Sequence, residues 1–189
     1  MQKPTAISGH FHAVRFYKDD DSLCSMVADF VGEGLGIGQP AIMIATSVHS
    51  AGISSVLASR SFDIQQLQEN GDLLLLDADE ILSRFMVAGM PNEKRFNATL
   101  IPEIEKACRG RTARTIRAYG EMVDVLWKGG HTVAATRLEM LWNKLAATHD
   151  FSLVCGYSMG NFYKDAAIEE ICSHHSHILS GTGEAALVN

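Results

Sequence analysis

Three polar side chains stand at the exit of an apolar stretch, in the segment RTIRAYGEMV. Arg117 and Tyr119 alternate with apolar neighbours, so both point to the same face of a predicted strand. Glu121 follows near the start of the next helix. A guanidinium, a phenol and a carboxylate at one strand end can form the polar floor of a small-ligand site. The alternative is structural: Glu121 complements the helix dipole and Arg117 pairs with it.

A helical segment, LEMLWNKL, supplies further candidates. Glu139, Trp142 and Asn143 have the spacing that places side chains on one helical face. A tryptophan beside an amide and a carboxylate either lines a pocket or packs in the core. The predicted ligand-binding residues are Tyr17, Arg117, Tyr119, Glu121, Trp142, Asn143 and Tyr157.

A second kind of chemistry is indicated near the C-terminus, in ICSHHSHIL. Cys172 and His175 are three residues apart on the predicted last helix, and thiolate with imidazole can ligate zinc or another transition metal. That helix should run back beside the last strand and end near the edge where His12 opens the first strand. His12, Cys172 and His175 therefore form the predicted metal site. The alternative is a set of histidines at a helix end with no shared ion.

Motifs for catalysis are largely absent. The chain has no GxxxxGK[ST] or HExxH, and the turn FYKDDDSL holds three aspartates where a phosphate-binding loop would need glycines and a lysine. Those aspartates would repel phosphate, which argues against ordinary ATP binding. The segment GYSMG fits GxSxG after a strand, but the acid and histidine would both come from one short helix directly behind Ser158. A hydrolase is therefore disfavoured.

Short apolar runs alternate with helical patterns along the chain. Strands are predicted at 12–17, 41–46, 73–78, 113–119 and 151–157, and helices at about 19–36, 79–87, 93–109, 134–145 and 163–175, with Pro102 kinking or splitting the third. This alternation predicts an α/β fold with a mostly parallel central sheet of about five or more strands, flanked by helices. Ligands of such sheets bind beyond the carboxyl ends of the strands, where Arg117, Tyr119 and Glu121 are expected.

Length and composition predict one soluble domain. The 189 residues suffice for a hydrophobic core, and we expect a single domain at 10–179 with flexible ends at 1–9 and 180–189. The net charge of −6 disfavours direct binding to nucleic acid or to an anionic membrane. No apolar run approaches the roughly 18 residues of a membrane span, and no signal peptide is recognisable. Four scattered cysteines suit free thiols in a reducing compartment, so a cytoplasmic protein is expected.

Five segments in order resemble one known family. They are FHAVRFYKDDDSL, FVGEGLGIGQPAIMIAT, RAYGEMVDVLW, LEMLWNKL and ICSHHSHIL, and over about residues 10–179 they resemble the MEDS domain, first recognised in a dichloromethane-responsive repressor. The resemblance implies a degenerate RecA/KaiC-like three-layer core that lacks a working P-loop. It also implies that RTIRAYGEMV takes the place of the Walker B strand.

The resemblance further implies a non-catalytic sensory domain of a signal-transduction system. Such a domain would bind a small organic, hydrocarbon-derived molecule and relay the signal to a histidine kinase or a transcriptional regulator. On this chain the family's histidine and cysteine positions correspond to His12, Cys172 and His175, with a bound transition metal as one option. The alternatives are a protein–protein interaction module without a ligand and a residual nucleotide-binding, ATPase-like protein. Assembly into a homo-oligomer is also open.

Overall fold

A seven-stranded sheet lies at the centre of the described part of the chain. The computed structural model describes residues 11–110, 115–161, 165–179 and 185–188. The strands of the sheet are β1 (Phe11–Tyr17), β2 (Ala41–Ala45), β3 (Leu73–Asp77), β6 (Ile116–Gly120), β7 (Phe151–Ser158), β8 (His177–Leu179) and β9 (Ala185–Leu187). Their order is β3-β2-β6-β7-β1-β8-β9, and every neighbouring pair is parallel except β8 with β9. The predicted α/β fold with a mostly parallel sheet is therefore confirmed.

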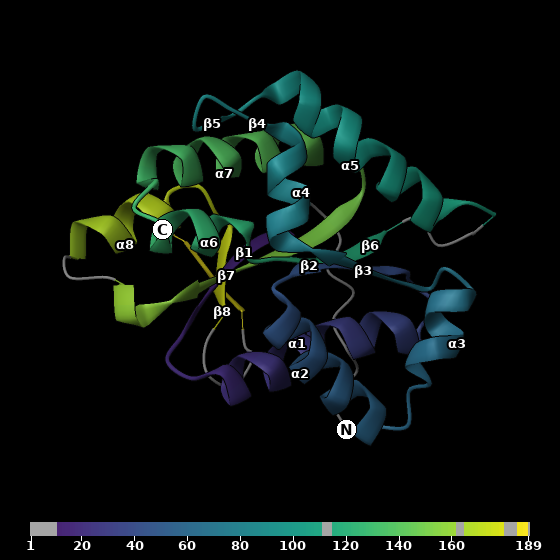
Figure 1. The fold of residues 1–189 in the computed structure, drawn as a ribbon. Coiled ribbons are helices and arrows are strands. Elements are labelled where there is room, and N and C mark those ends of the chain that lie inside the picture. The colour runs from purple at the N-terminus through teal and green to yellow at the C-terminus, as the bar shows by residue number, and fades with distance from the viewer. Residues whose placement is uncertain (1–10, 111–114, 162–164, 180–184, 189) are drawn as a thin grey trace.

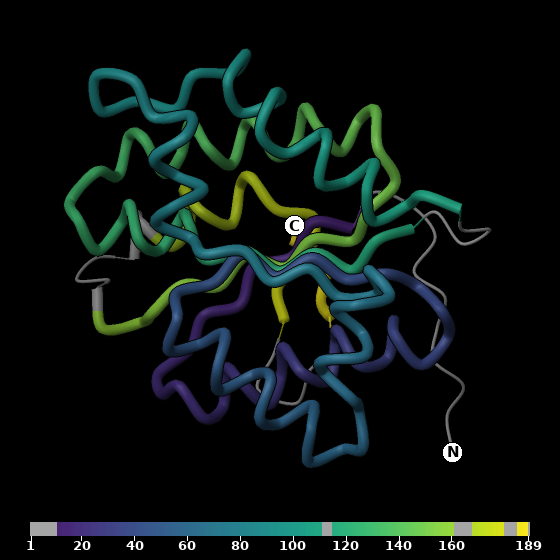
Figure 2. Tube along the Cα trace, turned by 45° about the vertical axis from the view of Figure 1, so that its right-hand side comes forward, coloured from purple at the N-terminus to yellow at the C-terminus, as the bar shows by residue number. Residues whose placement is uncertain are grey.

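Helices cover both faces of the sheet, which gives three layers (Figures 1 and 2). The helices are α1 (Asp20–Gly36), α2 (Ser47–Ser59), α3 (Ile64–Glu69), α4 (Ala78–Phe85), α5 (Glu93–Cys108), α6 (Met122–Lys128), α7 (Thr132–Ala146) and α8 (Asp165–Cys172). In Figure 1, α1, α2 and α3 lie below the sheet, and α4, α5, α6 and α7 lie above it. A small hairpin of β4 (Met86–Val87) and β5 (Met90–Pro91) follows α4, and the 3₁₀ turn η1 (Met159–Asn161) follows β7.

Local sequence explains where several elements begin. Asp19 precedes α1, and its carboxylate accepts a hydrogen bond from the Ser22 amide at 2.8 Å. Asp77 and Asn92 cap α4 and α5 in the same way. Such caps satisfy amide donors that the first helical turn leaves unpaired. The strands β2 and β6 are buried along their whole length, as expected for parallel strands covered on both faces.

Several elements differ from the predicted ones. Helices α2 and α3 were not predicted, because only Ile53 and Leu57 of α2 repeat as buried apolar residues and α3 buries none. Pro102 lies inside a single helix, α5, rather than splitting it. The predicted flexible C-terminal end contains a strand, β9, which pairs with β8. Residues 1–9 and 180–184, also predicted to be flexible, lie outside the described residues, as do 113 and 114 of the predicted fourth strand.

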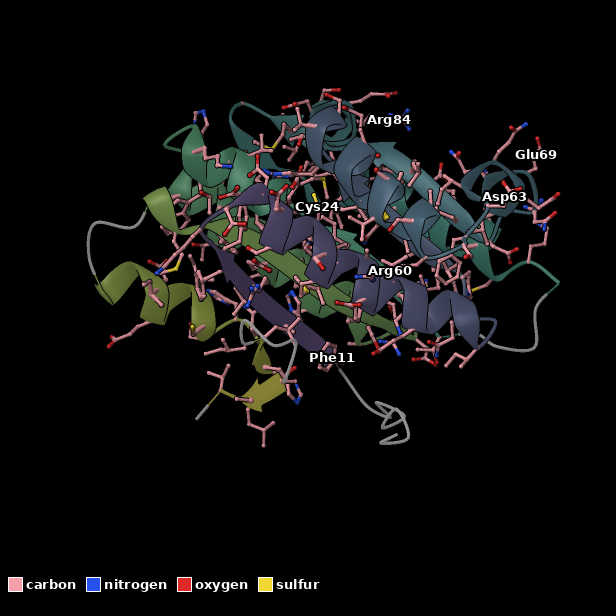
Figure 3. All side chains as sticks on the ribbon, turned by 90° about the horizontal axis from the view of Figure 1, so that it is seen from below. Phe11, Cys24, Arg60, Asp63, Glu69 and Arg84 are labelled. Carbon is pink, nitrogen blue, oxygen red and sulfur yellow. The ribbon has the colours of Figure 1, made fainter. Side chains whose placement is uncertain are left out.

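Side chains of the central strands alternate between two separate cores. Tyr17 and Tyr119 belong to the core under α1 and α2, whereas Trp142 and Tyr157 belong to the core under α4 to α7. Figure 3 views the molecule from below and shows α1 and α2 side by side. Arg60, directly after α2, pairs with Asp29 of α1 at 2.7 Å. The prediction that Tyr17, Tyr119 and Trp142 line one pocket is therefore wrong, because the sheet separates the two tyrosines from Trp142.

Helix α1 packs directly against the Arg117 side chain of β6 at Gly34. A Cβ atom at this position would lie 2.3 Å from Cγ of Arg117, whereas one at Gly36 would meet nothing within 4 Å. Both glycines belong to the same helix.

We expect Gly34→Ala to lower the free energy of unfolding by about 1–3 kcal/mol, because the Arg117 side chain must move out of a packed layer. Gly36→Ala is the matched control and should be neutral or stabilising by up to about 1 kcal/mol, since alanine is the better helix former. Urea denaturation of both variants measures the difference. Equal effects at the two positions would show that α1 does not pack on β6 as described.

Candidate functional site

Four buried side chains that can ligate a metal meet on the α7 face of the sheet. They are His12 of β1, Glu139 of α7, Cys155 of β7 and His175, which follows α8, and their ligand atoms all lie within 4.8 Å of one another. We call these four residues the buried cluster. Strands β1 and β7 are direct neighbours with His12 opposite Leu153, so Cys155, two residues further along the same face, comes within reach.

The hydrogen bonds of Asn143 determine which ring nitrogen of His12 is the donor. The Asn143 amide nitrogen donates to the carbonyl of His174 at 2.8 Å, so its oxygen must face Nδ1 of His12, 2.9 Å away. Nδ1 therefore carries the proton as donor, and in the neutral ring Nε2 keeps its lone pair. Nε2 lies 3.3 Å from Cys155 Sγ and 3.3 Å from a Glu139 oxygen. The lone pair thus points into the buried cluster.

His175 is arranged in the same way. Its Nδ1 lies 2.8 Å from the Ile171 carbonyl, which can only accept, so Nδ1 carries the proton. Burial lowers the pKa of His175 to about 4, so the ring is neutral near pH 7. Its Nε2 is buried with no hydrogen-bond donor within the described ranges, and it lies 3.4 Å from Oε1 of Glu139. A lone pair here faces a carboxylate oxygen, which only a proton or a cation can reconcile.

Glu139 stands at the centre of the buried cluster. Its Oε1 accepts a hydrogen bond from the Tyr157 hydroxyl at 2.7 Å, and its Oε2 lies 3.7 Å from Cys155 Sγ. Burial alone would raise the pKa of Glu139, but positive charge on His175 and His12, together with the Tyr157 hydroxyl, lowers it to about 2. The carboxylate is therefore ionised when positive charge, from a protonated imidazole or a bound cation, lies beside it.

This donor set fits a transition metal ion. Two imidazole nitrogens, one sulfur and one carboxylate oxygen are the ligand types of zinc and its neighbours. The outer hydrogen bonds of Asn143, Ile171 and Tyr157 are those that commonly orient metal ligands. The chain thus contains a buried His/Glu/Cys/His group able to hold a metal.

The predicted metal site differs from this arrangement in its sulfur ligand and lacks Glu139. His12 and His175 come together, with ring centroids 4.3 Å apart. Cys172 is outside the group, because α8 ends at Cys172 and the chain turns before His175, so the two do not share a helical face. Cys155 provides the sulfur instead. The sequence held two partial signals, a cysteine within a buried strand and a glutamate on the otherwise apolar face of α7, but not the strand register that brings them together.

The predicted ligand-binding residues divide among several places. Asn143 and Tyr157 support the buried cluster, while Tyr119 and Glu121 belong to a polar network at the carboxyl ends of the strands. Arg117 is not part of this network. It lies at the beginning of β6, donates to Gln39 at 2.9 Å and covers the Phe30 ring at 4.9 Å. The alternation of side chains along the strand predicted Arg117 and Tyr119 on one face. Their polar groups nevertheless lie at opposite ends of β6, with Gln39 and with Glu121.

Glu121 is held by three donors in the polar network. Its carboxylate accepts hydrogen bonds from the Thr46 amide, from Nδ1 of His49 and from the Tyr119 hydroxyl. His49, on α2, also pairs through Nε2 with Asp20 at 3.2 Å. The hydrogen bond to Glu121 is the largest influence that raises the pKa of His49, against the opposing effect of burial. Burial alone would raise the pKa of Glu121, but His49 and Thr46 lower it.

Tyr17 belongs to a neighbouring part of the same edge. Its hydroxyl donates to Asp124 at 2.9 Å, and Lys128 approaches both groups, at 3.1 Å from the hydroxyl and 2.7 Å from the carboxylate. The other Asp124 oxygen accepts from the Ser158 amide at 3.0 Å. Burial, reinforced by Asp124, raises the pKa of Tyr17, which therefore stays protonated.

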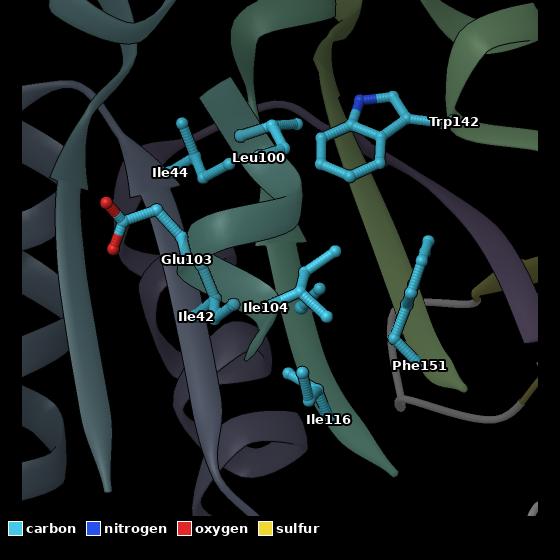
Figure 4. A pocket seen from close by; sticks show the side chains of 9 residues that line it. Ile42, Ile44, Leu100, Glu103, Ile104, Ile116, Trp142 and Phe151 are labelled. Atoms are coloured by element: carbon cyan, nitrogen blue, oxygen red, sulfur yellow. The ribbon is translucent and has the colours of Figure 1, made fainter. Parts of the chain in front are cut away.

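Trp142 lines a small apolar pocket between α5, α7 and the sheet (Figure 4). The other lining residues are Ile42, Ile44, Leu100, Glu103, Ile104, Ile116, Ala118 and Phe151. In Figure 4 the carboxylate of Glu103 points away from Trp142, so the wall near the indole is apolar. The cavity volume of about 10 Å³ is close to that of a single water-sized sphere. An organic ligand would fit here only after the helices had moved apart.

Solved structures assign the fold to a known class. The chain resembles a KaiC-like protein of the hyperthermophilic archaeon Pyrococcus horikoshii OT3, with a TM-score of 0.57 and 13% identity, over 89% of this chain and 71% of that one. It also resembles an uncharacterised protein of Pyrococcus horikoshii, solved in complex with an unknown peptide, with a TM-score of 0.65 and 11% identity, over 97% and 85% of the two chains. At these identities the likeness concerns the fold, which is KaiC-like.

The sequence itself identifies the family of the chain. The model of the MEDS family, the methanogen/methylotroph, DcmR sensory domain, matches residues 11–176, so the chain belongs to that family of sensory domains. Among curated proteins, none matches the chain. In the part of the chain that is described, no helix combines the length and apolar character needed to cross a membrane.

The ion pair between His49 and Glu121 should make the free energy of unfolding depend on pH. A histidine with a raised folded-state pKa contributes stability that is complete below its unfolded pKa, near 6.5, and is lost as the pH rises through the folded value. The lowered pKa of Glu121 gives a contribution that is present above about 4.5 and is lost at lower pH. We therefore expect His49→Gln to be most destabilising between about pH 4.5 and 6.5, with a smaller effect at alkaline pH.

Urea denaturation of the wild type and His49→Gln across this range measures the difference. His131→Gln is the control, because His131 is exposed and its side chain makes no capping hydrogen bond. A difference between wild type and His49→Gln that does not change with pH would contradict the assigned ion pair.

Proposed function

We propose that this chain is a non-catalytic sensory domain whose sensory site is the buried cluster with a bound transition metal ion. Membership of a sensory family supports the general function. The observation that carries the site is the convergence of His12 Nε2, His175 Nε2, Glu139 and Cys155 Sγ in a buried space, where no donor from the described residues satisfies His175. A site that only filled the core would not need four such groups.

The signal is, in this proposal, a small organic molecule of the hydrocarbon-derived kind, passed on to a histidine kinase or a transcriptional regulator. The family description, a methanogen/methylotroph sensory domain, supports a small carbon compound as the signal. An ion in the buried cluster would offer such a molecule a polar attachment point.

The strand ends argue against nucleotide hydrolysis. The Asp19 carboxylate already accepts from the first turn of α1, where a phosphate would otherwise bind, and Asp20 and Asp21 add negative charge. Glu121, which follows the Walker B-like strand, is engaged by His49, Thr46 and Tyr119 rather than free to activate water. We therefore infer that the KaiC-like fold has been kept without ATPase chemistry.

Calorimetric titration with Mg-ATP and Mg-GTP should give no binding heat at micromolar concentrations. The same protein sample should bind a transition metal, which serves as the control for folded, competent protein. Micromolar nucleotide affinity would overturn the non-catalytic assignment, because nothing in the acidic turn after β1 could account for it.

Cobalt titration tests the proposed metal site. We expect one Co²⁺ per chain, with visible d–d bands and a near-ultraviolet charge-transfer band from the Cys155 thiolate. Cys155→Ser should abolish the charge-transfer band and weaken binding by more than about tenfold, since loss even of an outer-shell partner commonly costs that much.

Cys172→Ser is the matched control and should retain the band, because Cys172 lies outside the buried cluster. A charge-transfer band that depends on Cys172 instead, or no cobalt binding at all, would contradict the proposal. With the Co²⁺ form in hand, small alcohols and thiols serve as probes of ligand access. Bands that none of them shifts would contradict an organic ligand at the ion.

A further inference from the structure

The four residues of the buried cluster come from two parts of the chain. His12, Glu139 and Cys155 lie on β1, α7 and β7, which are central elements of the sheet and its covering layer. His175 lies between α8 and β8. We define the C-terminal unit as the described residues 165–179 and 185–188, which comprise α8, β8 and β9. One ligand of four therefore belongs to a peripheral unit at the edge of the sheet.

The C-terminal unit meets the rest of the molecule around the buried cluster. Strand β8 pairs with β1 at two positions, Ala13 with His177 and Val14 with Ile178. Ser176 exchanges hydrogen bonds with the backbone of His12, donating its amide to the carbonyl at 2.7 Å and accepting the His12 amide on Oγ at 3.0 Å. Asn143, which orients His12, donates to the His174 carbonyl. Docking of the unit and assembly of the site thus involve the same residues.

Docking brings two atoms that can ligate a metal together. When the unit is docked, His175 Nε2 is buried 3.4 Å from Oε1 of Glu139, and no hydrogen-bond partner among the described residues satisfies it. A metal ion bonded to both atoms would link the C-terminal unit to α7.

The charges of the ligands indicate which ion. As metal ligands, a Cys155 thiolate and the Glu139 carboxylate would together carry two negative charges, and the ligating imidazoles would be neutral. A divalent ion makes the whole group neutral, which suits complete burial in an apolar layer. One sulfur, two nitrogens and one oxygen favour the borderline-soft ions of the zinc class over the hard ions magnesium and calcium.

We propose that the buried cluster binds a divalent ion of the zinc class and that the ion, by bonding His175, clamps the C-terminal unit onto the sheet. This inference rests on the proposed metal site and adds to it the element that metal occupancy controls. Binding energy available only in the docked arrangement shifts the population towards it.

Hydrogen–deuterium exchange of the full chain, with and without one equivalent of Zn²⁺, tests the clamp. We expect backbone amides of 172–179 to exchange about tenfold or more slowly with zinc, because the ion stabilises the docked unit. Amides of β2 and β3, on the far side of the sheet, should change little and provide the internal reference. Zinc content is measured on the same samples.

His175→Ala should remove the zinc-dependent protection of 172–179 even when the protein is saturated with zinc through the remaining three ligands. His174→Ala is the matched control, because only the backbone carbonyl of His174 takes part in the contacts described. Zinc bound through Cys155 without added protection at 172–179 would overturn the clamp and leave the metal site standing. Absence of zinc binding would overturn both.

Discussion

The Glu139 carboxylate lies almost fully buried within an apolar layer, and its charge constrains everything around it. A buried charge is tolerated only when it is paired or satisfied by hydrogen bonds. The Tyr157 hydroxyl satisfies one oxygen, and Nδ1 of each histidine donates outward, to Asn143 and to the Ile171 carbonyl, so that Nε2 of each faces the carboxylate. In the proposed site a divalent metal ion, bonded also by the Cys155 thiolate, would supply the positive charge at the centre.

The sheet separates this buried cluster from the polar network at the strand ends, yet two strands serve both. Strand β1 carries His12 near its start and Tyr17 at its end, and β7 carries Cys155 and Tyr157 before Ser158. Tyr17 and the Ser158 amide both bind Asp124. Internal carboxylates occupy this edge, whereas the buried cluster lies on the α7 face of the sheet.

The sequence predicted the fold better than the site. Continuous apolar strands and well-capped helices carry strong local signals, so the parallel sheet was predictable, whereas α2 and the short strand β9 were not. His12 and His175 could be brought together because topology sets where a last helix ends. Cys155 could not be preferred over Cys172 as the sulfur ligand. The spacing of Cys172 and His175 can be read from the sequence, whereas the β1–β7 register, which brings Cys155 to His12, cannot. The same limit grouped Arg117 and Trp142 with Glu121 as ligand-binding residues.

X-ray absorption at the zinc edge of the zinc-loaded protein tests the central claim most directly. The account predicts one sulfur at about 2.3 Å and three nitrogen or oxygen ligands at about 2.0–2.2 Å, with an imidazole signature from two histidines. Cys155→Ser should remove the sulfur contribution and leave the imidazoles. A zinc ion surrounded only by oxygen and nitrogen in the wild type, as at a surface site, would contradict the account, as would a shell with two or more sulfurs.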